Sequence, residues 1–290
     1  MQTEPPLILF IGVFNPSSTN FSQASCLEKQ GAIVRRYGYR KQLNNLQGPD
    51  ARDTELIKII NELRPDFTIT AKGSGINIRI YESTSCCTKH LLWYPDTLNS
   101  NWNRELREKI QVCDYVACAW KGPAEKAKEI NDQSFHVPEG FDPDIDQVIP
   151  DIKPDINVSF IGNLDGTRRP YHKAYPFQVF DNAFGYDHAR AVCQSKINLN
   201  FTRKGGTSDR VYKVLAARGF LLTQPWPGME DEFTPGKDFV LFNDAEDMKR
   251  KIMAHLDADK LRNMIAAHGH ETVQQYSRNA WAHSILEIVK

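Results

Sequence analysis

The sequence predicts an α/β protein built from two Rossmann-like domains, each with a parallel β-sheet. Residues 7–14 are a continuous apolar run that leads into Asn15 and a polar loop, which is typical of a buried parallel strand. The same pattern restarts at residues 157–161, where a second apolar run is followed by Gly162 and Asn163. Short apolar runs alternate with helical patterns after both starts, as parallel sheets require. We therefore expect domains at residues 1–150 and 151–276.

The bulk composition is that of a globular protein. At 290 residues and 41% apolar content, the chain can build two medium-sized cores. Lys plus Arg and Asp plus Glu both number 36, so the formal net charge is zero, which argues against a non-specific nucleic-acid binder. The six cysteines form no CxxC pair, so we expect reduced thiols and a cytoplasmic protein. Residues 7–14 are too few to span a membrane.

The elements of the first domain follow from short-range patterns. Strands are expected at residues 7–14, 32–37, 67–70, 90–97 and 113–118, because each is a short run rich in apolar or β-branched residues. Helices are expected at residues 22–30, 53–63 and 122–129, where apolar positions recur at helical spacing. The segment 142–155 is rich in Pro and Asp and is predicted to be the linker between the domains.

The second domain is predicted in the same way. Strands are expected at residues 157–161, 220–223 and 239–242, and helices at 210–217, 245–256 and 260–276. A further strand at residues 195–200 is implied by the family resemblance described below. Residues 170–187 are aromatic-rich and short for a full helix–strand–helix layer, which suggests a trimmed domain. The last amphipathic segment, within residues 277–290, is a final helix.

The stretch from Gly205 to Trp226 carries the strongest functional signal. It reads as a glycine pair, a helix that opens with Ser208 and Asp209 at its N-cap, and a buried strand. Arg210 and Lys213 lie on the first turns of this helix, beside its unpaired N–H groups, so they predict an anion site. Our hypothesis is that this element holds a diphosphate. The alternative is an ordinary loop–helix–strand unit with solvated cations.

The motif SDRVYKVLAARGFLLT at residues 208–223, followed by Gly228, Phe233, Gly236 and Arg262, resembles the C-terminal half of the spore-maturation-type (CgeB-like) glycosyltransferases. The likeness extends from about residue 90 to the end of the chain. It implies the GT-B architecture, in which two Rossmann-like domains face a central cleft and a C-terminal helix, here 277–290, crosses back to the first domain. It also implies transfer of a sugar from a nucleotide donor, for which we expect UDP, without a bound metal or other cofactor.

The resemblance assigns the donor to residues 151–276. It implies that Arg168 neutralises the leaving diphosphate. We expect Arg210 and Lys213 to add positive charge there, although the family usually has an acidic residue at position 213, which contacts the donor ribose. The full set of candidate donor-binding residues is Gly162, Asn163, Arg168, Asn200, Ser208, Asp209, Arg210, Tyr212 and Lys213. A departing diphosphate needs this positive charge because its own charge grows as the glycosidic bond breaks.

The acceptor is assigned to residues 1–150. Asp96 follows an apolar strand and is our candidate to position or deprotonate the acceptor hydroxyl. The alternative is that Asp96 caps the helix beginning near residue 99. The remaining acceptor-side candidates are Asn15, Lys72, Glu139 and Gly140. Asp142, Asp144 and Asp146 form two DxD triplets that resemble metal-binding motifs, but their place in the linker favours a structural role.

The acceptor itself is left open by the sequence. The basic run at residues 35–41, with Arg35, Arg36, Arg40 and Lys41 interleaved with Tyr37 and Tyr39, is consistent with a DNA partner and hence with glycosylation of a modified DNA base; solvated charges at a strand edge are the plainer alternative. Two other hypotheses remain, which are a binding module without transfer activity and a sugar-nucleotide epimerase.

Overall fold

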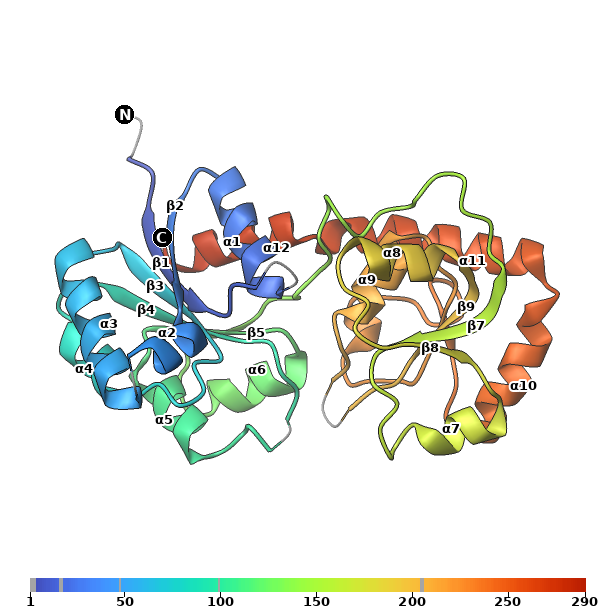
Figure 1. Cartoon of the computed structure of the whole chain (residues 1–290), viewed down its shortest axis with the longest axis horizontal. Helices are drawn as coiled ribbons and strands as arrows, with labels where there is room; N and C mark the ends of the chain where they lie inside the picture. The colour runs from blue at the N-terminus through green and yellow to red at the C-terminus, as the bar shows by residue number, and fades with distance from the viewer. Residues whose placement is uncertain (1–3, 16–17, 47, 99, 204–205) are drawn as a thin grey trace. The chain divides into compact units, whose positions relative to one another are not determined.

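A computed structural model describes residues 4–15, 18–46, 48–98, 100–203 and 206–290. The chain forms two compact units, shown in Figure 1. Unit 1 is Met1–Glu139 together with Arg278–Lys290, and unit 2 is Gly140–Ser277. The sequence predicts these boundaries after residues 150 and 276. Gly205, the first glycine of the motif discussed above, lies outside the described residues.

Unit 1 contains a six-stranded parallel sheet in the order β2-β1-β3-β4-β5-β6. The strands are β1 (Leu7–Gly12), β2 (Ile33–Gly38), β3 (Phe67–Ala71), β4 (Lys89–Tyr94), β5 (Tyr115–Cys118) and β6 (Ser134–His136). The helices are α1 (Thr19–Lys29), α2 (Tyr39–Asn45), α3 (Pro49–Leu63), α4 (Arg79–Thr84), α5 (Arg104–Val112) and α6 (Lys121–Lys128). The central strands β1, β3 and β4 are almost wholly buried, which explains their continuous apolar runs.

Unit 2 repeats the plan with a five-stranded parallel sheet in the order β11-β10-β9-β7-β8. Its strands are β7 (Ile156–Ile161), β8 (Gln178–Phe180), β9 (Ser195–Asn200), β10 (Leu221–Thr223) and β11 (Val240–Leu241). Its helices are α7 (Arg169–Ala174), α8 (Tyr186–Cys193), α9 (Arg210–Ala216), α10 (Ala245–Leu256) and α11 (Asp259–Val273), with short 3-10 turns at Met229–Asp231 and Gln274–Tyr276. In unit 1, β1 lies between β2 and β3, and in unit 2, β7 lies between β8 and β9. The chain connections therefore run in opposite directions from β1 and from β7. Ligands of open α/β sheets bind at this switch point, outside the carboxyl ends of the strands.

The last helix, α12 (Arg278–Ile288), packs within unit 1 although it ends the chain. The Trp281 side chain is 1% exposed and contacts the rings of Phe10 and Trp93, with centroid separations of 6.4 and 5.4 Å. The predicted α/β class and the return of the C-terminal helix to the first domain are thereby confirmed. None of the helices among the described residues is both long and apolar enough to cross a membrane.

Candidate functional site

The switch point of unit 2 lies between β7 and β9, and polar side chains meet there. Asn200, the last residue of β9, is fully buried. Its amide nitrogen donates to the hydroxyls of Thr207 and Thr223, at 2.8 and 2.9 Å. Its amide oxygen accepts from Arg210 Nη1 at 2.9 Å. Because both ends of the amide are bonded, Asn200 fixes the position of the Arg210 guanidinium.

Arg210 opens α9 and turns its guanidinium toward the end of β7. Its carbon Cζ lies 4.8 Å from the centroid of the Phe160 ring, and Nη1 also donates to Ser208 Oγ at 3.1 Å. Burial lowers the pKa of Arg210 to about 10, and the charges of Arg168 and Arg203 act in the same direction against the opposing effect of Asp209. The guanidinium is therefore still charged at neutral pH, but it is held at a cost that a bound anion would offset.

Gly162 makes room for this arginine. A Cβ at position 162 would lie 2.8 Å from Arg210 Nη2 and 3.2 Å from the Phe160 ring, and the residue has φ +139°. Both the space and the backbone conformation require glycine. The predicted association of Gly162 with the charged site thus has a steric cause.

Arg168 and Arg203 add charge to the same place. Arg168 is 7% exposed, lies 5.1 Å from the Phe160 centroid, and donates from Nη1 to the Asn163 carbonyl at 2.7 Å and to Asp165 at 3.1 Å. Arg203 lies 3.8 Å from the same carboxylate of Asp165. Burial lowers the pKa of Arg168 as well. We call Arg168, Arg203 and Arg210 the arginine cluster; sequence reasoning had proposed two of the three.

A pocket of about 510 Å³ opens beside the cluster, within the roughly 300–1,000 Å³ range of small-molecule sites. Its walls come from the carboxyl ends of the adjacent strands β7 and β8 and from Arg210. The lining residues are Ile161, Gly162, Asn163, Phe180, Asp181, Asn182, Ala183, Phe184 and Arg210. Asp181, Asn182 and Phe184 were missed from the sequence because β8 has only three residues and was not recognised as a strand.

Three other donor candidates are placed differently from one another. Ser208 belongs to the site through its hydrogen bond to Arg210. The Lys213 ammonium forms an ion pair with Asp209 at 2.6 Å, so its charge is offset locally. Tyr212 is 1% exposed and donates its hydroxyl to Glu232 at 2.6 Å, so it packs in the interior of unit 2. Arg210, Asn200, Ser208 and Gly162 therefore lie together in one site, whereas Tyr212 does not belong to it.

The predicted helix start is also different in detail. Asp209 is the N-cap of α9, and its side chain makes no capping hydrogen bond. The helix has only seven residues, so the charge of the site comes from arginine side chains rather than from a helix dipole.

Asp96 and Lys72 meet at the carboxyl ends of β4 and β3 in unit 1. Lys72 Nζ lies 2.8 Å from Asp96 Oδ1, and Asn101 donates to Asp96 Oδ2 at 3.2 Å. These residues line a small cavity of about 90 Å³ together with Ser74 and Asn103. The alternative that Asp96 caps the next helix is wrong, because Asn103 caps α5 by accepting from the Leu106 N–H.

A buried charged network shapes the loop beneath this cavity. Lys72, Gly73 and Gly75 all have positive φ, at 60°, 64° and 76°. The Lys109 ammonium, 1% exposed, donates to the Gly73 carbonyl and to Glu105, and Glu105 accepts from the Gly75 N–H at 2.7 Å. Burial lowers the pKa of Lys109, and Glu105 opposes that shift. The loop that carries Lys72 is therefore held from below.

The remaining acceptor-side candidates are spread along the chain. Asn15 is exposed beyond the carboxyl end of β1, and its carbonyl accepts from the Ser18 N–H at 2.9 Å. Glu139 is buried at the end of the first stretch of unit 1. Gly140 has φ +69°, and a Cβ there would collide with the Tyr276 carbonyl oxygen. The backbone conformation and the close approach of Tyr276, both within unit 2, therefore explain why position 140 is a glycine.

The basic run at residues 35–41 is not an aromatic platform. Tyr37 is 5% exposed and donates to Glu55 at 2.7 Å, while Tyr39 is 2% exposed. Arg36 forms an ion pair with Glu28 at 2.7 Å. Stacking of DNA bases on these tyrosines, which the DNA hypothesis would allow, is excluded because β2 and α2 turn both rings into the core. Arg35, Arg40 and Lys41 remain exposed.

Asp142 and Asp146 are buried, and their carboxylates accept hydrogen bonds from backbone N–H groups of the same segment. Asp146 accepts from the Asp142 N–H at 2.8 Å, and Asp142 accepts from the Asp144 N–H at 2.9 Å. Within the described ranges, no group of three or more His, Cys, Asp or Glu side chains is placed to hold a metal ion.

Comparisons with known proteins agree with this fold. The family described as glycosyl transferase-like matches residues 145–289. No curated protein matches the sequence significantly. Sucrose-phosphate synthase from Thermosynechococcus elongatus has a similar structure, with TM-score 0.73, 10% identity and coverage of 98% of both chains. Anabaena HepE, solved in complex with UDP and glucose, has TM-score 0.69 and 10% identity over 97% of this chain and 98% of its own.

TarM from S. aureus is also similar, with TM-score 0.64 and 11% identity over 82% of this chain. The present chain spans 58% of the length of TarM. At these identities the likeness concerns the fold, and it confirms the two-sheet GT-B architecture.

Proposed function

Because the chain belongs to the glycosyl transferase-like family, we propose that it transfers a sugar from a nucleotide-sugar donor to an acceptor hydroxyl, with the arginine cluster holding the donor diphosphate. The observation that carries the proposal is Arg210. Among the described residues, the hydrogen bonds of this guanidinium go to Asn200 and Ser208, which are both neutral. Desolvation makes this cation costly even with the opposing charge of Asp209 nearby, and a bound anion would offset that cost.

The donor fits the neighbouring pocket in the following way. The diphosphate lies against Arg210, Arg168 and Arg203, where charge-assisted hydrogen bonds to phosphate oxygens are strongest. The nucleoside extends along the ends of β7 and β8, where Phe184 offers an exposed ring and Asp181 a carboxylate for ribose hydroxyls. UDP is the nucleotide we propose, since HepE, which shares the fold, was solved with it. Assignment to the spore-maturation type, and independence from metal, stay part of this proposal.

The arginine cluster acts on the step that breaks the glycosidic bond. As the bond breaks, negative charge develops on the diphosphate, and fixed guanidinium groups stabilise that charge without having to reorganise. On the acceptor side, Asp96 positions the attacking hydroxyl and accepts its proton, with Lys72 holding the carboxylate in place.

The first test is thermal unfolding with UDP, GDP, dTDP, ADP and CMP. A nucleotide present at 100 times its Kd stabilises the native state by about 2.7 kcal/mol. We expect UDP to raise Tm in the wild type and the Arg210→Gln variant to lose that shift. Arg250→Gln, which removes an exposed arginine of α10, is the matched control and should keep it. A full UDP shift in Arg210→Gln would refute the site.

The second test separates donor binding from transfer. Asp96→Asn should keep the UDP shift and lower sugar transfer by about 100-fold or more, because positioned acid–base groups contribute on that scale. Retained transfer in Asp96→Asn would remove Asp96 from the mechanism.

One alternative is a nucleotide-sugar-binding module without transfer activity. It is favoured because position 213 is a lysine that pairs with Asp209, so this position offers no carboxylate to the donor ribose. Such a module would bind UDP-sugar and release no UDP with any acceptor, whereas an enzyme releases UDP. A DNA acceptor would be held by the exposed cations Arg35, Arg40 and Lys41, so salt-sensitive retention on DNA tests that class.

A further inference from the structure

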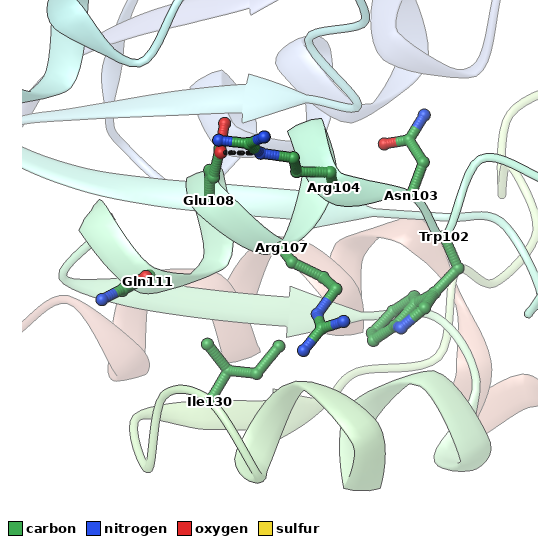
Figure 2. Close-up of a pocket in the computed structure, with 7 residues that line it drawn as sticks. All are labelled: Trp102, Asn103, Arg104, Arg107, Glu108, Gln111 and Ile130. Atoms are coloured by element: carbon green, nitrogen blue, oxygen red, sulfur yellow. Dashed lines mark hydrogen bonds and ion pairs between the residues drawn. The ribbon is translucent and has the colours of Figure 1, made fainter.

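Unit 1 contains a second pocket, larger than the Asp96 cavity, that the proposed donor site does not use. It has a volume of about 380 Å³ and lies along α5, as Figure 2 shows. Its walls are Trp102 and Asn103 before the helix, one face of α5, and Ile130 after α6. The volume is within the range of small-molecule sites. Asn103 also lines the small cavity that contains Asp96, so the two hollows are adjacent.

Trp102 supplies a fixed aromatic wall. Its ring packs edge-to-face on Tyr94, with centroids 5.6 Å apart, and rests against the buried core of unit 1. The residue is nonetheless only partly buried, and its indole borders the pocket (Figure 2). The negative face of an aromatic ring attracts the weakly positive C–H groups of a sugar ring. An indole held by the core offers such a face without loss of side-chain entropy on binding.

Arg107 supplies an exposed positive charge to the pocket. Its guanidinium lies between Trp102 and Ile130 in Figure 2, and no hydrogen bond or ion pair to it is found within the described part of the chain. Arg104, one turn earlier, is different because it forms an ion pair with Glu108 at 2.6 Å. A guanidinium with free N–H groups beside an aromatic wall is suited to a carboxylate or a phosphate group.

The other lining groups distinguish a sugar from a nucleic acid. The side-chain amides of Asn103 and Gln111 and the carboxylate of Glu108 supply both donors and acceptors, as hydroxyl groups require. A nucleic-acid backbone is usually bound by several Lys or Arg side chains that neutralise successive phosphates. The carboxylate of Glu108 would instead repel those phosphates. The lining combines Arg107, the mutually paired Arg104 and Glu108, and neutral polar groups, which matches a ligand with one anionic group and several hydroxyls.

We propose that this pocket binds a sugar bearing one anionic group, either a carboxylate or a phosphate, as part of the acceptor. The acceptor role rests on the proposed function, whereas the binding itself does not. The sugar ring stacks on Trp102 and its anion pairs with Arg107. Asn103 joins the pocket to the Asp96 cavity, so a bound sugar lies next to the carboxylate that positions the acceptor hydroxyl.

The test is isothermal titration of the full chain with glucuronic acid, glucose 6-phosphate, glucose and inorganic phosphate. Because Arg107 is exposed, we expect an anionic sugar to bind about three- to fivefold more tightly than glucose, the effect of an exposed ion pair worth up to about 1 kcal/mol. The better of glucuronic acid and glucose 6-phosphate identifies the anion. Arg107→Gln should reduce its affinity to that of glucose, and Trp102→Leu should weaken the binding of anionic and neutral sugars alike.

Lys58→Gln is the control, because it removes one exposed positive charge from α3 of the same unit, away from the pocket lining. Equal affinity for glucose and the anionic sugars, or unchanged affinity in Arg107→Gln, would overturn the proposal. Inorganic phosphate binding as tightly as glucose 6-phosphate would also overturn it. The UDP shift of the same samples reports on unit 2 separately, so failure of the donor site and failure of this pocket give different results.

Discussion

At the scale of single residues, the candidate donor site depends on a glycine and an arginine that occupy one space. Gly162→Ala places a Cβ 2.8 Å from Arg210 Nη2 at a backbone φ of +139°. We expect it to lower the free energy of unfolding by about 1–3 kcal/mol and to weaken UDP binding by displacing the guanidinium. Gly166→Ala is the control, because nothing lies within 4 Å of its Cβ. Urea denaturation and UDP titration of both variants measure the two effects; equal behaviour would contradict the steric argument.

Glu232 makes the stability of unit 2 depend on pH. Burial raises its pKa from 4.5 to about 7, although the Tyr212 hydroxyl donates to it. The folded state therefore holds a proton that the unfolded state has released between about pH 4.5 and 7, and stability falls as pH rises through this window. Glu232→Gln should abolish this fall and stabilise the protein at pH 8 by on the order of 2 kcal/mol. Denaturation at pH 5 and pH 8 checks this, with exposed Glu230→Gln as control; a parallel fall in Glu232→Gln would refute it.

At the scale of elements, the position of α9 depends on close packing against α11. Gly269 in α11 lets that helix approach the Asp238 carbonyl and the Leu215 side chain of α9. Alanine is favoured over glycine by about 1 kcal/mol inside a helix, yet Gly269→Ala should destabilise the protein by about 1–3 kcal/mol, because the added Cβ collides with backbone. Thermal unfolding measures the sign. Glu271→Ala, at an exposed position of the same helix, should change Tm little; a Tm increase in Gly269→Ala would show that the contact relaxes easily.

At the scale of the whole molecule, the last helix stabilises the first unit. Trp281→Ala removes a fully buried indole from between Phe10 and Trp93 and should cost about 3–5 kcal/mol. The loss should appear in unit 1 alone. Hydrogen exchange resolves this, with faster exchange in β1 and β4 and unchanged exchange in β7 and β9. Uniform acceleration in both units would contradict the division.

The sequence predicted the fold well for physical reasons that particular elements illustrate. Buried parallel strands such as β1 and β7 are continuous apolar runs, so they stand out, and α10 was predicted with its observed ends. Strand β8 was missed because three residues are too few for a period. The helices α2 and α7 were missed as well, since neither presents a clear apolar face.

The site was predicted in part. Gly162, Asn200 and Arg210 come together because residues at the carboxyl ends of neighbouring strands share one edge of the sheet. The pairing of Lys213 with Asp209 follows helical i, i+4 spacing, so the sequence contained it, but the predicted phosphate contact took precedence. The Trp102 pocket is different, because Ile130 reaches it only through tertiary packing.

The place of α12 also bears on how a ribosome delivers this protein. Unit 2 is continuous from Gly140 to Ser277, so its whole sequence is synthesised before Trp281 exists. Domains usually fold in the order in which they are made. Here the unit that starts first must wait for the last helix, with Phe10 and Trp93 unpaired during translation. A chain truncated after Ser277 and released from the ribosome should therefore hold a folded second unit and a first unit that chaperones still recognise.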